Sequence, residues 1–154
     1  MKLFLKIEAL LQNDKAMLEV ANQCDKAYAK GVGHPDWHKP FKLSDTIKMA
    51  QNMAGLQAVI TTVSIVAEIR GLDTESHFIA ILREMAEQSL NEIETKIALR
   101  LANATWGAGQ RWRVDEKYPH GRPINVFDGL PPAEVAKDMH QIVVAASWLL
   151  KKLS

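Results

Sequence analysis

Apolar residues recur at alternating steps of three and four along four segments of the chain, and this pattern constrains the fold more than any other. The segments span residues 3–28, 49–67, 79–101 and 135–153. Such spacing places one apolar stripe along one face of an α-helix. The sequence shows no strand-like alternation of apolar and polar residues. It therefore predicts an all-α protein, an antiparallel four-helix bundle that buries the four stripes against one another.

Single residues mark the ends of the first two helices. Asp14 interrupts the first stripe, so a kink or a short break is expected within the sequence QNDK. Ser44 is placed to cap the second helix, and Gly71 is placed to end it in a left-handed conformation. Gly71 and the two residues after it, GLD in the sequence, form a tight connection to the third helix.

The third and fourth helices also carry start signals. The third is expected to begin after Asp73 or Thr74 and to reach residue 101 as one helix. Pro131 and Pro132 set the entry to the fourth, because proline is well tolerated at the first helical positions. The first and third connections are long, whereas the second is short.

Length and composition favour one soluble helical domain spanning residues 1–154. The formal charge is +1, from 19 basic and 18 acidic residues, so no overall field attracts nucleic acid or a membrane. The uncharged stretch 49–67 contains several polar residues and suits a buried core helix better than a membrane span. Cys24 is the only cysteine and lies on the first apolar stripe, which favours a core role and a cytoplasmic location.

Two connections, residues 31–43 and 106–130, are rich in aromatic and basic side chains. In an up-down-up-down bundle they emerge at the same end. The aromatic residues that this brings together are Trp37, Phe41, Trp106, Trp112, Tyr118 and Phe127. In one interpretation they only pack together and seal the end of the bundle. In the other they form a pocket with polar groups among the aromatic rings.

The pocket interpretation favours a compact anionic or planar ligand, nucleotide-like, or a protein surface as partner. Tryptophan rings would stack on a planar group and arginine would supply charge. Each loop carries a net charge of only +1, which argues against an extended nucleic acid. No cofactor is implied. The residues expected to bind are His34, Trp37, His38, Arg111, Trp112, Arg113, Tyr118, His120 and Arg122.

The segment FDGLPPAEVAKD resembles the end of the ryanodine-receptor repeat (RyR) domain. The family pattern aromatic-acidic-x-Leu-Pro-x-x-Glu-x-x-Lys-Asp is matched in register by Phe127, Asp128, Leu130, Pro131, Glu134, Lys137 and Asp138. Upstream, GQRWR and KYPHGRP resemble looser versions of two further family elements. The resemblance covers about a third of the chain and implies a small helical module that binds a partner rather than an enzyme.

Two further hypotheses remain open. Glu84 and Glu87 lie three residues apart on one helix face, as in all-α pyrophosphohydrolases that bind magnesium through paired carboxylates. Alternatively, the chain is a structural dimerising protein. Apolar residues beyond the main stripes, Val59, Val66, Val143, Val144 and Trp148, favour a homodimer through helical faces, with Trp148 as an interface anchor.

Overall fold

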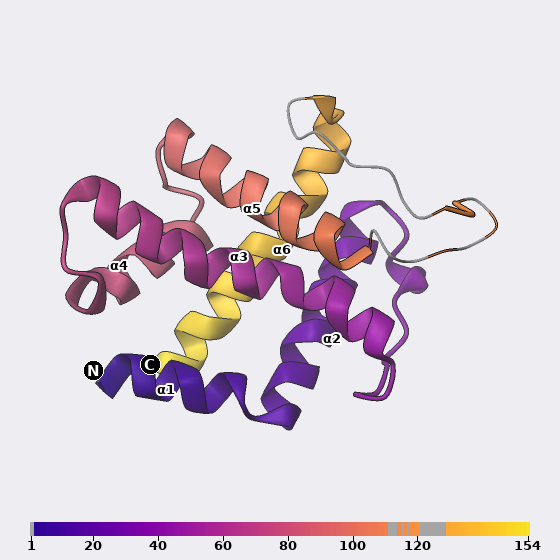
Figure 1. Cartoon of the computed structure of the whole chain (residues 1–154), viewed down its shortest axis with the longest axis horizontal. Helices are drawn as coiled ribbons and strands as arrows, with labels where there is room; N and C mark the ends of the chain where they lie inside the picture. The colour runs from indigo at the N-terminus through magenta and orange to yellow at the C-terminus, as the bar shows by residue number, and fades with distance from the viewer. Residues whose placement is uncertain (1, 111–113, 115, 117, 121–128) are drawn as a thin grey trace.

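The structure is a computed structural model that describes the chain except for residues 1, 111–113, 115, 117 and 121–128. Among the described residues it contains helices and no strand, which confirms the all-α class. The elements in Figure 1 are α1 (Lys2–Leu11), α2 (Asp14–Gly31), the short 3-10 turn η1 (Pro35–Trp37), α3 (Thr46–Arg70), α4 (Thr74–Ala86), α5 (Glu92–Gln110) and α6 (Pro132–Leu153).

The break expected within QNDK is confirmed. Helix α1 ends at Leu11, and α2 begins at Asp14. Between them Asn13 acts as the N-cap of α2, because its side-chain oxygen accepts a hydrogen bond from the backbone N–H of Ala16 at 2.9 Å. The chain changes direction between the two helices (Figure 1).

The start of α3 lies one residue later than predicted, whereas its end is where Gly71 predicts it. Asp45, not Ser44, is the N-cap residue, and its carboxylate accepts a hydrogen bond from the backbone N–H of Lys42 at 2.9 Å. The side chain of Asp45 therefore closes the preceding turn and makes no capping hydrogen bond to α3. Gly71 has a φ of 67°, the left-handed conformation that a helix C-terminus favours.

The predicted third helix is wrong, because this region forms two helices. Helix α4 stops at Ala86 and Gln88 takes a φ of 57°. Asn91 then starts α5 with a reciprocal pair of hydrogen bonds to Glu94, at 2.8 Å and 3.3 Å. The apolar spacing continues across the break through Leu90, so periodicity alone concealed it. The chain thus forms six described α-helices instead of the four expected.

The starts of α4 and α6 agree with prediction. The carboxylate of Asp73 accepts a hydrogen bond from the backbone N–H of Ser76 at 2.8 Å, which caps α4. Pro131 is the N-cap residue of α6, and Pro132 is its first helical residue. These prolines fix the direction in which α6 leaves the segment that precedes it.

Helix α3 lies at the centre of the fold and contacts α2, α4, α5 and α6. In Figure 1, α6 crosses α3 rather than running alongside it. Among the described residues, α3 is the one helix long and apolar enough to cross a membrane by length and composition. More than half of its apolar window is buried inside the fold, so burial accounts for its hydropathy.

The apolar residues that suggested a homodimer are used largely within the chain. Val59 and Val66 are fully buried, and Trp148 is only 4% exposed, with its indole N–H donating to Glu19 Oε1 at 2.8 Å. Trp148 is therefore a core residue and not an exposed interface anchor. The homodimer stays a prediction. Cys24 is fully buried as predicted, and burial raises the pKa of its thiol to about 12.

Candidate functional site

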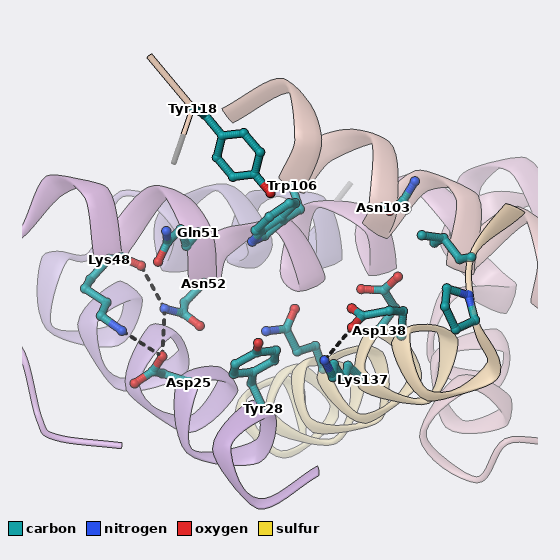
Figure 2. Close-up of a pocket in the computed structure, with 14 residues that line it drawn as sticks. Asp25, Tyr28, Lys48, Gln51, Asn52, Asn103, Trp106, Tyr118, Lys137 and Asp138 are labelled. Carbon is teal, nitrogen blue, oxygen red and sulfur yellow. Dashed lines mark hydrogen bonds and ion pairs between the residues drawn. The ribbon is translucent and has the colours of Figure 1, made fainter. Parts of the chain in front are cut away.

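A cleft of about 660 Å³ opens between α2, α3, α5 and α6. Figure 2 shows Asp25 and the amides of Gln51 and Asn52 on one side, Lys137 and Asp138 on the other, and Trp106 between them. The residues that line the cleft are Asp25, Tyr28, Lys48, Gln51, Asn52, Asn103, Trp106, Tyr118, Leu130, Pro131, Glu134, Lys137, Asp138 and Gln141.

Asp25, at one edge of the cleft, joins the segment 31–43 to two helices. One carboxylate oxygen lies 2.7 Å from Nδ1 of His38, and the other accepts hydrogen bonds from Lys48 Nζ and Asn52 Nδ2, each at 3.4 Å. A buried carboxylate needs several such partners to offset its lost hydration. The bonds occupy Asp25, so we assign it and His38 a structural role.

A second contact fixes the same segment. The side-chain amide of Asn22 accepts a hydrogen bond from the backbone N–H of Phe41 at 3.1 Å and donates one to its carbonyl oxygen at 3.3 Å. The ring of Phe41 is 9% exposed, so it belongs to the core. The segment is therefore held by α2 through both polar and apolar contacts.

The structure brings few of the predicted ligand-binding residues to the cleft. His34 and Trp37 stack on each other, with ring centroids 4.1 Å apart, and Trp37 is 59% exposed outside the cleft lining. His38 is bound to Asp25, and His120 is exposed and does not line the cleft. Tyr118 does line it. The remaining four predictions, Arg111, Trp112, Arg113 and Arg122, lie outside the described residues.

One face of α6 supplies four residues of the cleft, Glu134, Lys137, Asp138 and Gln141. Their spacing of three and four places them side by side on the helix. Lys137 Nζ donates to Glu134 Oε1 at 2.6 Å and lies 5.7 Å from the centre of the Tyr28 ring. The hydrogen bond to Glu134 raises the pKa of Lys137, so the ammonium group is charged and held in place.

Asp138 presents a carboxyl group to the cleft with no hydrogen-bond partner among the described residues. Burial raises its pKa from 3.8 to about 6, and the nearby charge of Glu134 acts in the same direction. The positive charge of Lys137 lowers the pKa of Asp138 in part, but the ammonium group donates its hydrogen bond to Glu134 and not to Asp138. The carboxyl group is therefore available to a bound molecule.

Gln141 lies one helical turn further along α6 and is only 8% exposed. Its side-chain amide also makes no hydrogen bond within the described part of the chain. Its amide group is open to the cleft, because Thr62 Oγ1 is the one buried side-chain N or O atom without a partner among the described residues. The amide is therefore within reach of a molecule bound in the cleft.

Close packing of α6 on α3 sets the position of Gln141. A Cβ atom built at Gly55 of α3 would lie 3.3 Å from both the Cβ and the backbone oxygen of Gln141. Glycine is thus needed for the two helices to approach this closely. The sequence contains this signal as a single glycine inside a long apolar helix, which periodicity alone does not connect with a site.

The described lining of the cleft has a small negative charge. Lys48 and Lys137 face the three carboxyl groups of Asp25, Glu134 and Asp138, which leaves one negative charge when all are ionised. Four side-chain amides and three aromatic rings make up most of the remaining surface. This composition suits a ligand with hydrogen-bonding edges and a flat face better than one with several negative charges.

The alternative magnesium pair, Glu84 and Glu87, has a different environment. Arg70 Nη1 donates to Glu84 Oε2 at 2.7 Å, and the same guanidinium group binds Glu94, whose side chain is 2% exposed. Glu87 lies exposed at the C-terminal cap of α4. Among the residues that the structure describes, no group of three or more His, Cys, Asp or Glu side chains is placed to hold a metal.

The α6 face was not predicted as a site from the sequence, although part of it stands in a segment with a family resemblance. Glu134, Lys137 and Asp138 belong to the segment that resembles the RyR domain, and the adjoining Leu130 and Pro131 also line the cleft. A run of polar residues at spacings of three and four beside an apolar stripe was the signal available.

No family model, curated protein or solved structure matches this chain.

Proposed function

We propose that the protein is a non-enzymatic binding module whose cleft takes a compact, planar, polar ligand such as a nucleobase or nucleoside. The observation that carries this proposal is the pair Asp138 and Gln141. Both are polar, lie on one face of α6 and lack a hydrogen-bond partner among the described residues. No described side chain occupies their hydrogen-bonding groups, so a ligand in the cleft can bind both of them.

The size and surface of the cleft support a ligand of this kind. Its volume of about 660 Å³ falls within the range of small-molecule sites. Tyr28, Trp106 and Tyr118 supply flat apolar surface from three separate parts of the chain. Because the described lining is negative overall, we favour the planar ligand over the anionic one among the partners expected from sequence.

The other sequence-based hypotheses have weaker support. The expected antiparallel four-helix bundle stays a hypothesis. The proposal uses only the four helices α2, α3, α5 and α6, which form the walls of the cleft. A relation to the RyR domain is consistent with a binding role but stays a hypothesis. The homodimer and the cytoplasmic location are separate proposals, and the first is tested by sedimentation of the full chain.

The magnesium-dependent hydrolase also remains a hypothesis, but no observation favours it. Arg70 already neutralises Glu84, so a cation would have to displace a guanidinium group that also holds Glu94. Glu84→Gln that abolished magnesium-dependent nucleotide hydrolysis would establish the enzyme. Unchanged background hydrolysis would leave Glu84 in the structural role described above.

The first experiment measures thermal unfolding of the full chain with nucleobases, nucleosides and nucleoside monophosphates, each with and without magnesium. A ligand at about 100 times its Kd stabilises the folded state by about 2.7 kcal/mol. We expect the nucleosides to stabilise the protein without magnesium and to change tryptophan fluorescence. Trp106→Phe identifies the part of the change that arises in the cleft.

A matched pair of variants locates the binding. Gln141→Ala removes the amide that lines the cleft, whereas Gln57→Ala removes an exposed amide on α3. We expect the first to reduce ligand stabilisation and the second to leave it unchanged. The proposal fails if no compound in the panel binds, or if both variants bind as the original chain does.

A further inference from the structure

Asp138 and Gln141 present a defined order of hydrogen-bonding groups along α6. When ionised, the carboxylate of Asp138 only accepts hydrogen bonds, and it can accept two side by side. The amide of Gln141 can donate through its NH₂ group. The two residues are three positions apart, so their side chains are neighbours on the helix surface. Lys137 does not interrupt the pair, because its ammonium group is bound to Glu134.

This order of groups has a complement among planar heterocycles. The carboxylate can accept from two adjacent N–H donors, and the amide NH₂ can donate to a carbonyl oxygen beside them. A ring with a carbonyl group, a ring N–H and an amino group in sequence presents these three on one edge. An adenine-type edge presents a ring nitrogen acceptor beside its amino group, and the lone pair of that nitrogen would face the carboxylate oxygen.

We propose that the cleft recognises a guanine-type edge, with Asp138 accepting from the ring N–H and the amino group, and Gln141 donating to the carbonyl oxygen. This inference rests on the proposed function and specifies its ligand class. The same edge occurs in guanine nucleosides and in pterins, so the shared chemistry is a 2-amino-oxo pyrimidine ring. Phosphate groups are not required for this recognition.

Specificity arises because a ligand with a different edge leaves Asp138 or Gln141 without a hydrogen bond. A site built to accept two N–H groups discriminates strongly against a ligand that lacks one, because the buried acceptor then loses its hydration without compensation. Inosine lacks the amino group but keeps the ring N–H and the carbonyl. Adenosine lacks both the ring N–H and the carbonyl, so it should bind more weakly than inosine.

Protonation of Asp138 would change this preference. The charged and titratable groups that line the cleft around it are Asp25 and Tyr28 from α2, Lys48 from α3, Glu134 and Lys137 from α6, and Tyr118. Burial places the pKa of Asp138 at about 6, so the carboxylate form prevails above neutral pH. Below that pKa the protonated carboxyl group can donate a hydrogen bond through its O–H. It can then bind the ring nitrogen acceptor of an adenine-type edge.

The test measures the binding of guanosine, inosine, adenosine and a pterin to the full chain by titration calorimetry at pH 8 and at pH 5. At pH 8 we expect guanosine to bind about tenfold or more tightly than inosine, since each charge-assisted bond contributes about 1.5–3 kcal/mol. Adenosine should bind more weakly still. At pH 5 the ratio of guanosine to adenosine affinity should fall. The pterin arm distinguishes the two sources of the shared edge.

Asp138→Asn gives a sharper readout than loss of binding. An amide at this position presents an NH₂ donor in place of one acceptor, so it should prefer a ligand with a carbonyl oxygen where guanosine carries its amino group. We therefore expect guanosine affinity to fall at least tenfold and xanthosine affinity to rise in this variant. Thermal unfolding of the unliganded variant checks that it folds.

The outcomes separate this inference from the proposed function. If no nucleoside or pterin binds, both are overturned. If nucleosides bind with equal affinity, or adenosine binds best at pH 8, only the guanine-type edge is overturned. Equal weakening of every ligand by Asp138→Asn, without a gain for xanthosine, also overturns it, because a merely structural carboxyl group would give that result.

Discussion

The arginine group at one end of α3 and the α6 side of the cleft leave their polar side chains in opposite states. At one end of α3, Arg70 binds both Glu84 and Glu94 with four hydrogen bonds between 2.7 Å and 3.2 Å. In the cleft, Asp138 and Gln141 have no hydrogen-bond partner among the described residues. The first region, which we call the arginine cluster, is fully paired within the folded chain, whereas the cleft leaves these two side chains open to another molecule.

The difference shows why polar burial alone does not identify a site. In the arginine cluster, the hydrogen bond from Arg70 lowers the pKa of Glu94 although its side chain is almost fully buried. In the cleft, burial of Asp138 raises its pKa, because no cation is bound to it. The direction of the shift thus separates a carboxyl group that is satisfied by the fold from one that is left available.

The largest effect is expected from breaking the arginine cluster. Arg70→Met leaves Glu94 buried without a counter-charge, and such a loss typically costs about 3–5 kcal/mol of folding free energy. Chemical unfolding of the variant and the original chain measures this difference. Lys96→Met is the control, because Lys96 forms only an exposed pair with Glu92 at 3.8 Å and should change stability by less than about 0.5 kcal/mol. Similar losses in both variants would refute the contrast.

A smaller effect is expected from Asp138. Its pKa is raised from 3.8 to about 6 on folding, so between these values the folded chain binds more protons than the unfolded chain. Stability contributed by the protonated group is therefore present below pH 4 and lost as pH rises to 6, by about 1–3 kcal/mol. Asp138→Asn should remove this part of the pH dependence, measured as the difference between the two unfolding curves.

Glu94 provides the opposite sign in the same measurement. Arg70 lowers its folded-state pKa, so its contribution to stability is present above the ordinary value of 4.5 and lost at lower pH. Asp138→Asn should therefore change the part of the curve in which stability falls with rising pH. Arg70→Met should change the part in which stability rises with pH. Identical profiles for Asp138→Asn and the original chain would mean that the carboxyl group of Asp138 is not perturbed.

A third prediction concerns how closely α6 approaches α3. Gly55→Ala places a methyl group 3.3 Å from the backbone oxygen of Gln141, so α6 must shift by a few tenths of an ångström. We expect a net loss of about 1 kcal/mol, since overpacking outweighs the higher helix propensity of alanine. Gly107→Ala has no atom within 4 Å of the new methyl group and should stabilise α5 slightly. Nucleoside affinity should fall for Gly55→Ala alone.

The smallest effect is expected at Lys48, which lies in the cleft but is half exposed. Its ammonium group is 3.4 Å from Asp25, a residue that also has His38 and Asn52 as partners. Lys48→Met should therefore cost less than about 0.5 kcal/mol. A loss as large as that for Arg70→Met would mean that Asp25 depends on Lys48, and that this edge of the cleft is as tightly paired as the arginine cluster.

Local signals in the sequence were interpreted correctly where one residue decides the outcome. Asp14, Gly71, Asp73 and Pro131 mark the chain locally, so the break between α1 and α2 and three helix ends were predicted within a residue or two. The break between α4 and α5 was missed, because Leu90 keeps the apolar spacing while Gln88 and Asn91 end one helix and begin the next.

The candidate site was predicted less well, for a different reason. Aromatic and basic residues in the two long connections suggested the ligand contacts, but His38 is bound to Asp25, and His34 stacks on Trp37 away from the cleft. Tyr118 alone among the described predictions lines the cleft. An unusual loop composition shows that a segment packs against something, but it does not show whether the contact is a ligand or the chain itself.

The sequence by itself determined the helical class, the core role of Cys24 and several helix ends, because periodicity and capping depend on residues within one or two turns. Only the tertiary structure decided which polar groups remain without partners. Arg70 meets Glu94 across 24 positions of sequence, whereas Asp138 meets no cation that binds it. Both outcomes follow from how α3, α5 and α6 pack, and a pattern along one helix carries no record of what the neighbouring helix presents to it.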